Sequence, residues 1–294
     1  MRYKELPKKW KVIATLLIIV NVLLIVLIIG FSIFLHIYRK NCAELRAPLK
    51  KEGSLLIGER VRIGRDKKDE VAVNLYIPSD TGNEKLPVVF NIHGGGFVGG
   101  DADMLDTQSD RIANDWSVIV VTVNYTTADV KSVSYGSEEI KDAVLYFADH
   151  ADTYHADTDR FTIMGYSAGA YYAAEAARML KKDGFEVASL VMCYPWTTGL
   201  PTKELSSDCP KTLFVLAGED PISQKAKNYM TAMKVEGVEV ETIEYDNAVH
   251  SFIESNNPEG ANDTSENMEN VINQVQEDLA REAENMIGEW IRKE

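Results

Sequence analysis

The 294-residue sequence predicts an α/β fold, with a mainly parallel eight-stranded sheet flanked by helices, behind an N-terminal transmembrane helix. Short apolar runs rich in β-branched residues alternate with helical stretches, which is typical of a parallel sheet buried on both faces. Turn-forming residues separate the runs from the helical stretches. Near the N-terminus, residues 12–35 carry no charge and are numerous enough to cross a bilayer as a helix.

We expect four segments: a basic tail over residues 1–11, a membrane anchor over 12–38, a polar linker over 39–53 and one globular domain over 54–294. The anchor would make the lipid bilayer a partner of this chain. A cleavable signal peptide is the alternative, but the apolar run is longer than usual and no small-residue cleavage site follows it. Basic residues balance at the two ends of the span, so they do not fix its orientation. The short basic tail favours a single-pass topology with the globular domain outside the cytoplasm.

Eight strands are expected in the globular domain. The first two are adjacent, and the second alternates apolar with polar residues as a half-buried strand does. The last also alternates, with glutamates at its polar positions, which predicts an edge strand. The expected ranges are 54–65, 70–78, 88–92, 118–123, 161–165, 190–194, 213–217 and 238–245.

Five helices are expected between and after these strands. Asp103 and Ser137 are candidate N-terminal caps of the first two. The last helix carries an apolar stripe at helical spacing, which predicts that it packs on the sheet. The expected ranges are 104–116, 137–150, 168–182, 223–235 and 266–291.

Composition excludes several classes of function. A formal net charge of −14 disfavours nucleic-acid binding, which depends on neutralising phosphates. Three cysteines give neither a disulfide framework nor metal-ligand spacing, and no metal is expected. Cys193 lies in an apolar run and is expected in the core, although a bridge to Cys209 stays open.

A candidate nucleophile lies where a predicted strand turns into a helix. The strand residues 161–164 lead into Gly-Tyr-Ser-Ala-Gly at 165–169 and directly into the next helix. This is the setting that the Gly-x-Ser-x-Gly pattern requires, because the sharp turn presents the serine hydroxyl at the end of the sheet. The glycines relieve crowding between strand and helix. The pattern therefore predicts Ser167 as a nucleophile.

A glycine-rich loop follows an upstream strand. Residues 93–97 read His-Gly-Gly-Gly-Phe, and consecutive glycines let backbone N–H groups approach and stabilise a developing oxyanion. We expect Gly95, Gly96 and Ala168 to supply these donors, and His93 to brace the loop. A phosphate-binding loop is excluded, because no Lys-Ser or Lys-Thr pair follows the glycines.

An acid and a histidine follow the serine in the chain order of a Ser-acid-His triad. Asp220 stands just past the predicted strand 213–217, with Glu219 as the nearest alternative. His250 is the one histidine of five that follows both this acid and a late strand. Side chains at the carboxyl ends of parallel strands gather at one edge, where α/β sites form. Ser167, Asp220 and His250 are therefore the predicted catalytic residues.

Together these motifs resemble the hormone-sensitive-lipase-like branch of the α/β-hydrolase family, which includes bacterial acetyl esterases. The resemblance covers residues 54–294. The sequence departs from the family pattern at Tyr166, where Asp is common, and at Ser251, where Gly is common. The resemblance rests on four motifs in chain order: residues 93–97, residues 165–169, Asp220-Pro221 and His250-x-Phe252.

The resemblance implies a carboxylic ester hydrolase that forms an acyl-enzyme on a small-molecule ester and needs no cofactor. Family members often carry a lid, but only residues 195–211 separate the sixth and seventh expected strands. This predicts little or no lid, and an open site suits short acyl groups such as acetyl. Phe97, Tyr166 and Trp196 are the candidate substrate-contacting residues.

Two other functions stay open from the sequence. One is a serine peptidase of the same fold, and the other is a non-catalytic hydrolase-like domain used for binding. The loop at residues 93–97 favours ester over peptide substrates. The presence of Ser167, Asp220 and His250 together argues against a non-catalytic domain.

Overall fold

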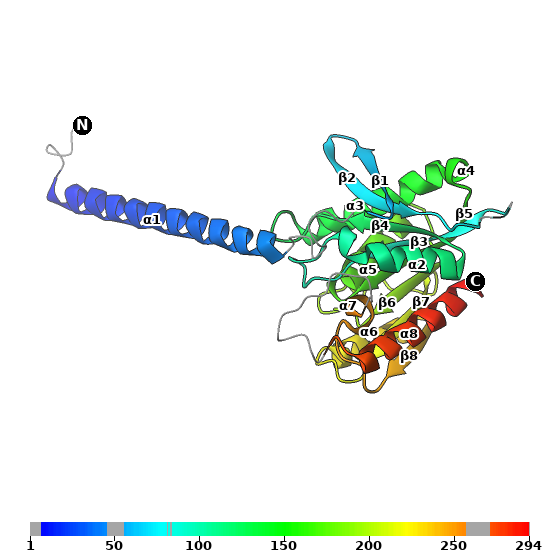
Figure 1. The fold of residues 1–294 in the computed structure, drawn as a ribbon. Helices are drawn as coiled ribbons and strands as arrows, with labels where there is room; N and C mark the ends of the chain where they lie inside the picture. The colour runs from blue at the N-terminus through cyan, green and yellow to red at the C-terminus, as the bar shows by residue number, and fades with distance from the viewer. Residues whose placement is uncertain (1–6, 46–55, 81, 83, 257–270, 294) are drawn as a thin grey trace. The chain divides into compact units, whose positions relative to one another are not determined.

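The computed structural model describes residues 7–45, 56–80, 82, 84–256 and 271–293. The chain divides between Glu44 and Leu45 into two units. The first contains all but the last residue of the helix α1 (Lys8–Leu45), and the second contains the globular domain (Figure 1). The two units are considered separately below.

Among the described residues, α1 is the one helix long and apolar enough to cross a membrane, by length and composition. Most of its apolar side chains over the expected span of residues 12–38 are exposed, and none of them is buried. The helix runs beyond that span to Leu45, because residues 39–45 contain no glycine or proline to end it. The first part of the predicted linker is therefore helical, and the rest of it, residues 46–53, lies outside the described residues.

The globular domain is built on one eight-stranded sheet in the order β1-β2-β4-β3-β5-β6-β7-β8. β1 pairs with β2 and β2 with β4 in antiparallel fashion, and every other pair is parallel. The predicted mainly parallel sheet is confirmed, with β8 at an edge as expected. The strands are β1 (Glu59–Arg65), β2 (Lys68–Tyr76), β3 (Leu86–Ile92), β4 (Ile119–Asn124), β5 (Ala156–Tyr166), β6 (Ser189–Cys193), β7 (Lys211–Ala217) and β8 (Val240–Tyr245).

Helices cover both faces of this sheet (Figure 1). Apolar residues of α3, α5 and α6 join one buried cluster with the sheet, and those of α2, α7 and α8 join another on the opposite face. Residues 194–210, between β6 and β7, contain neither helix nor strand, in keeping with the predicted small lid. The helices are η2 (Ala102–Leu105), α2 (Asp106–Trp116), α3 (Val133–Asp149), α4 (Ala151–Tyr154), α5 (Ala168–Lys182), α6 (Ser223–Val235), α7 (Phe252–Ser255) and α8 (Gln274–Arg292).

The predicted helix caps were wrong. α3 begins one turn earlier than expected, where the Ser132 hydroxyl accepts a hydrogen bond from the Tyr135 amide, and Ser137 is buried inside the helix. Asp101 rather than Asp103 caps the short helix η2. In both cases the turn that precedes the helix places a nearby polar side chain closer to the free amides.

The starts of β5 and of the last helix also differ from expectation. β5 starts at Ala156, five residues before the expected strand, since Leu86 of β3 pairs with Ala156 despite the polar residues that follow. α8 starts at Gln274, with Asn273 accepting from the Gln276 amide. The earlier part of the expected last helix, residues 266–270, lies outside the described residues.

Candidate active site

Ser167 lies at a strained turn between β5 and α5. Its φ of 52° and ψ of −116° are unusual for a residue with a side chain, and such strain is concentrated at functional sites. The flanking glycines allow this turn. A Cβ atom on Gly165 would lie 2.6 Å from the carbonyl carbon of Gly169, and one on Gly169 would lie 2.2 Å from the His93 oxygen. No larger residue fits at either position, so the close approach of strand and helix fixes the serine.

Ser167, His250 and Asp220 form a continuous hydrogen-bond chain. His250 Nε2 lies 2.8 Å from Ser167 Oγ, and His250 Nδ1 lies 2.6 Å from Asp220 Oδ2. With the Nδ1 proton donated to the carboxylate, Nε2 is free to accept the serine proton. The Asp220 side chain is 1% exposed, whereas that of His250 is 34% exposed. This arrangement leaves the imidazole accessible to a substrate while its carboxylate partner is shielded from water.

The acid loop shows why Asp220, and not Glu219, contacts the histidine. The second carboxylate oxygen of Asp220 accepts a hydrogen bond from the Ile222 amide at 2.9 Å, which fixes the side chain toward His250. Glu219 is exposed, and only its backbone is tied to the histidine loop, through an N–H to the Ala248 carbonyl at 3.0 Å. The structure thus brings Asp220 into contact with His250 and leaves the alternative acid outside.

The predicted oxyanion loop, residues 93–97, needs glycine at its centre. Gly95 has a φ of 125°, and its carbonyl accepts the Gly99 amide at 2.7 Å. A Cβ atom on Gly95 would lie 2.2 Å from the Gly99 oxygen. Gly96 also has positive φ, at 59°, and both residues are exposed. Among the described residues, no hydrogen bond uses the amides of Gly95, Gly96 or Ala168 as donors to another backbone group outside a helix or strand.

His93 braces this loop from below. Its ring is buried, stacks on Tyr125 at a centroid distance of 4.2 Å, and places Nδ1 2.7 Å from the Gly94 carbonyl. The Tyr125 hydroxyl donates to the His93 carbonyl at 2.8 Å. Burial lowers the pKa of His93 to about 4, so the ring is neutral at physiological pH. The loop therefore carries no positive charge of its own.

The three candidate substrate-contacting residues are in different environments. Phe97 and Trp196 are half-buried and their rings meet edge to face, 6.1 Å between centroids. Tyr166 is fully buried and stacks on Tyr194 at 6.1 Å, in the core layer that α2 and α8 cover. The prediction for Tyr166 was wrong, because the side chain preceding the serine points into the core.

A carboxyl group that sequence reasoning missed lies beside the serine. Glu254 is on α7, four residues after His250, and accepts a hydrogen bond from the hydroxyl of Tyr194. A Cβ atom on Gly94 would lie 2.9 Å from Glu254 Oε1 and 3.6 Å from Ser167 Cβ. Burial raises the pKa of Glu254 to about 8. The sequence gives little indication that Glu254 belongs to the site, because a glutamate after two apolar residues is typical of an ordinary surface position.

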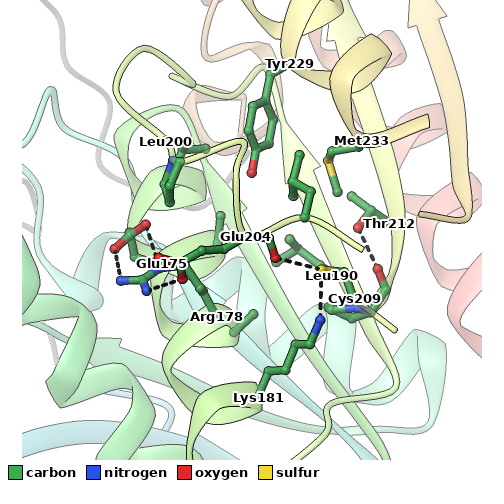
Figure 2. Close-up of a pocket in the computed structure, with 15 residues that line it drawn as sticks. Glu175, Arg178, Lys181, Leu190, Leu200, Glu204, Cys209, Thr212, Tyr229 and Met233 are labelled. Atoms are coloured by element: carbon green, nitrogen blue, oxygen red, sulfur yellow. Dashed lines mark hydrogen bonds and ion pairs between the residues drawn. The ribbon is translucent and has the colours of Figure 1, made fainter. Parts of the chain in front are cut away.

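A small pocket lies apart from this site, between α5, α6 and the segment that precedes β7 (Figure 2). It has a volume of about 50 Å³ and mostly apolar walls, with charged side chains such as Arg178 and Glu204 at its lining, and none of Ser167, Asp220 and His250 lines it. Cys209 reaches it with a free thiol, and Cys193 is a free thiol buried in β6, so the bridge left open from the sequence is not formed. Among the described residues, no group of three or more His, Cys, Asp or Glu side chains could hold a metal ion.

Relatives of known name match part of the chain. Arylacetamide deacetylase of Oryctolagus cuniculus is 33% identical over 129 residues, 42% of this chain and 32% of that protein. Esterase LipI of Mycobacterium tuberculosis is 30% identical over 145 residues, 48% of this chain and 45% of that protein. Acetyl esterase of Salmonella choleraesuis is 28% identical over 127 residues, 43% of this chain and 38% of that protein. The match thus spans less than half the length of each of these relatives.

Solved structures match over most of the chain. A hyperthermophilic esterase of the archaeon Pyrobaculum calidifontis superposes with a TM-score of 0.67 at 24% identity, covering 89% of this chain and 93% of that one. A fungal esterase of Rhizomucor miehei superposes with a TM-score of 0.67 at 20% identity, covering 87% of each chain. At such low identity these likenesses show a shared fold.

The sequence model of one family extends the match across the whole site. It is described as alpha/beta hydrolase fold and matches residues 89–208 and 200–254, more than half of the chain. The matched region runs from the strand before the oxyanion loop to Glu254, and so includes the serine, the acid and the histidine. The chain therefore belongs to the alpha/beta hydrolase fold family.

Proposed function

We propose that this chain is a serine carboxylesterase in which Ser167, His250 and Asp220 act as a catalytic triad. The observation that carries the proposal is the hydrogen-bond chain from Ser167 Oγ through both imidazole nitrogens to the carboxylate of Asp220. That arrangement gives a serine its base, and gives the base a partner that fixes its tautomer. The names of the relatives, an esterase, an acetyl esterase and a deacetylase, support the same reaction class.

Acylation would start when Ser167 Oγ attacks the ester carbonyl carbon and His250 takes the hydroxyl proton. The carbonyl oxygen becomes an oxyanion, which accepts hydrogen bonds from the amides of Gly95, Gly96 and Ala168. Asp220 stabilises the imidazolium that forms. Collapse of the tetrahedral species breaks the bond to the alkoxy oxygen, which takes the proton from His250 and leaves as an alcohol. The acyl group stays on Ser167.

Deacylation follows the same steps with water as the nucleophile. His250 takes a proton from water, whose oxygen attacks the acyl carbon, and the same amides hold the new oxyanion. The bond to Ser167 Oγ then breaks, the serine regains a proton from His250, and a carboxylic acid leaves. Each proton that the imidazole takes is returned, so the residues named here complete the cycle.

The preferred substrates are proposed to be esters of short acyl groups, acetyl above all. The segment between β6 and β7 adds no helix or strand over the sheet, and Gly95 and Gly96 are exposed at the loop. Half-buried Phe97 and Trp196 offer only a short apolar wall beside it. A long acyl chain would leave most of its methylenes in water, without the gain of about 0.8 kcal/mol for each one buried.

Acyl-chain length is the direct test of this proposal. The full chain, in detergent, is assayed on p-nitrophenyl acetate, butyrate and decanoate. We expect kcat/KM to be highest for acetate or butyrate and at least about tenfold lower for decanoate, because burial supplies little binding energy for the longer chain. A preference for decanoate would contradict the short-acyl proposal. Lack of turnover on all three esters by the folded chain would contradict the esterase proposal itself.

We further propose that α1 anchors the enzyme in a membrane with the globular domain outside the cytoplasm. The helix has 38 residues, hence a length of about 57 Å, which exceeds the roughly 30 Å hydrocarbon core. Exposed Trp10 and Tyr38 are about 42 Å apart along the axis, close to the distance between the two headgroup regions.

In cells that express the full chain, we expect the protein to stay with membranes after carbonate washing, because a spanning helix is held by hydrophobic burial. Protease added to intact cells is expected to digest the globular domain. Recovery of a soluble, N-terminally shortened chain would indicate a cleaved signal peptide instead. Digestion only after lysis would place the domain in the cytoplasm.

A further inference from the structure

The carboxyl group of Glu254 lies beside the space where the oxyanion loop approaches the nucleophile. Its Oε1 occupies the space that a side chain at Gly94 would fill, with the Tyr166 carbonyl and Ser167 Cβ as the next neighbours of that space. Its other oxygen, Oε2, accepts from the hydroxyl of Tyr194. The carboxyl therefore touches the loop and the end of β6 while its backbone belongs to the helix that follows His250.

Tyr194, which makes this contact, has a strained backbone conformation. Its φ is 35°, a conformation unfavourable for a residue with a bulky side chain. Its amide donates to the Val215 carbonyl at 2.7 Å, and its ring lies 5.3 Å from the His250 ring, edge to face. The strained residue thus joins the carboxyl of Glu254 to the catalytic histidine. Strain that persists at such a place points to a role in the site.

Several of the titratable groups close to the Glu254 carboxyl are neutral at mildly alkaline pH. Burial raises the pKa values of Tyr125, Tyr166 and Cys193 well above their usual range, so these three neighbours stay neutral in mildly alkaline solution. His93 beneath the loop is neutral above a pKa of about 4. The other titratable or charged groups that face this region from adjoining elements are Asp220, His250, Arg111, Arg281 and Glu284.

We propose that Tyr194 and the uncharged carboxyl of Glu254 form a positioning unit, which holds the oxyanion loop against Ser167 and must stay protonated for ester turnover. The inference rests on the proposed function and adds a regulatory group to the same site. A neutral carboxyl fills the space beside Gly94 without placing charge near the reacting atoms. An ionised carboxylate there would repel the oxyanion of the tetrahedral intermediate across a poorly solvated gap.

The sign of the pH dependence follows from the raised pKa. An acid with a pKa of about 8 is neutral below that pH and anionic above it. Turnover should therefore decline as pH rises through 8, and be about tenfold lower one pH unit above it than on the plateau. The decline should appear in kcat as well as in kcat/KM, because the charge opposes a step after substrate has bound.

The experiment compares pH–rate profiles of the full chain and three variants on p-nitrophenyl butyrate. The reaction is followed where the phenol and the phenolate absorb equally, with spontaneous hydrolysis subtracted. Glu254→Gln keeps the size of the side chain and cannot ionise, so we expect its alkaline decline to disappear. Tyr194→Phe removes a donor that favours the ionised form, so we expect its decline to move to higher pH. Glu219→Gln removes an exposed charge nearby, and we expect the wild-type profile.

The outcomes separate this inference from the proposed function. No turnover by the wild-type chain at any pH is a failure of the esterase proposal. Turnover with the same alkaline decline in the wild type and in Glu254→Gln overturns the positioning unit alone. If Glu254→Gln does not fold, the Tyr194→Phe profile decides: a decline at an unchanged or lower pH overturns the inference. A decline that also disappears in Glu219→Gln overturns it as well.

Discussion

Alanine in place of Ser167 is expected to reduce ester turnover by at least about 10⁴-fold, because no other group can form the acyl-enzyme. The fold should not change, since alanine and serine meet the same backbone strain at a φ of 52°. The side chain contributes one hydrogen bond, to His250 Nε2. The measurement is kcat/KM on p-nitrophenyl acetate for the full chain, with thermal unfolding of both proteins recorded alongside.

Ser255→Ala is the matched control for this variant. Ser255 lies on α7, close in sequence to His250, and its backbone amide donates to the Ser251 carbonyl at 3.1 Å, a bond that alanine keeps. We expect this variant to turn over acetate within about twofold of the wild type, because the loss of one half-buried hydroxyl leaves the contacts of Ser167, His250 and Asp220 intact. A Ser167→Ala protein that is folded and keeps more than about a hundredth of the wild-type rate would mean that another residue is the nucleophile.

Asn in place of Asp220 is expected to lower kcat by about 10⁴-fold with little change in structure. An amide has nearly the shape of the carboxylate, and its oxygen can still accept from the Ile222 amide. It carries no charge to stabilise the imidazolium, and it can donate to Nδ1, which would place the proton on the wrong nitrogen of His250. Single-turnover and steady-state rates on p-nitrophenyl acetate would show the loss in the acylation step.

Glu219→Gln tests whether the neighbouring acid contributes. Glu219 is exposed and only its backbone is tied to the histidine loop, so we expect turnover within about twofold of the wild type. Equal losses in Asp220→Asn and Glu219→Gln would show that the net charge of this loop, rather than the contact with Nδ1, governs the rate.

The parallel sheet was predictable because its strands are buried on both faces. β3, β6 and β7 are mostly apolar and almost entirely buried, and turn residues bound them, so the apolar run in the sequence is enough to locate each strand. The first five residues of β5 were not predictable, since Asp157, Asp159 and Arg160 interrupt the apolar run. Arg160 there donates to Asp157 at 2.7 Å and to the Lys85 carbonyl at 2.7 Å, contacts that no local pattern reveals.

The candidate site was predictable where chemistry dictates residue type. The reaction requires a tight turn at the serine, and only glycine fits at residues 165 and 169 of that turn. It also requires an acid and a histidine, which follow late strands in this fold. The reaction does not dictate the direction of a side chain. Tyr166 points into the core, and Glu254, on the short helix α7, approaches the loop at Gly94. Both facts depend on packing between segments far apart in the sequence.

The order of the strands has a consequence for how the activity responds to partial unfolding. β8, which precedes His250, lies at the edge of the sheet, and β7 is its one strand partner among the described residues. Its outward residues are largely exposed, so its detachment disrupts few buried contacts. Local opening at this edge would displace the imidazole while the central strands keep the serine turn intact. On warming, the activity should therefore be lost at a lower temperature than the sheet. Activity would then measure the stability of the β8 edge rather than that of the central strands.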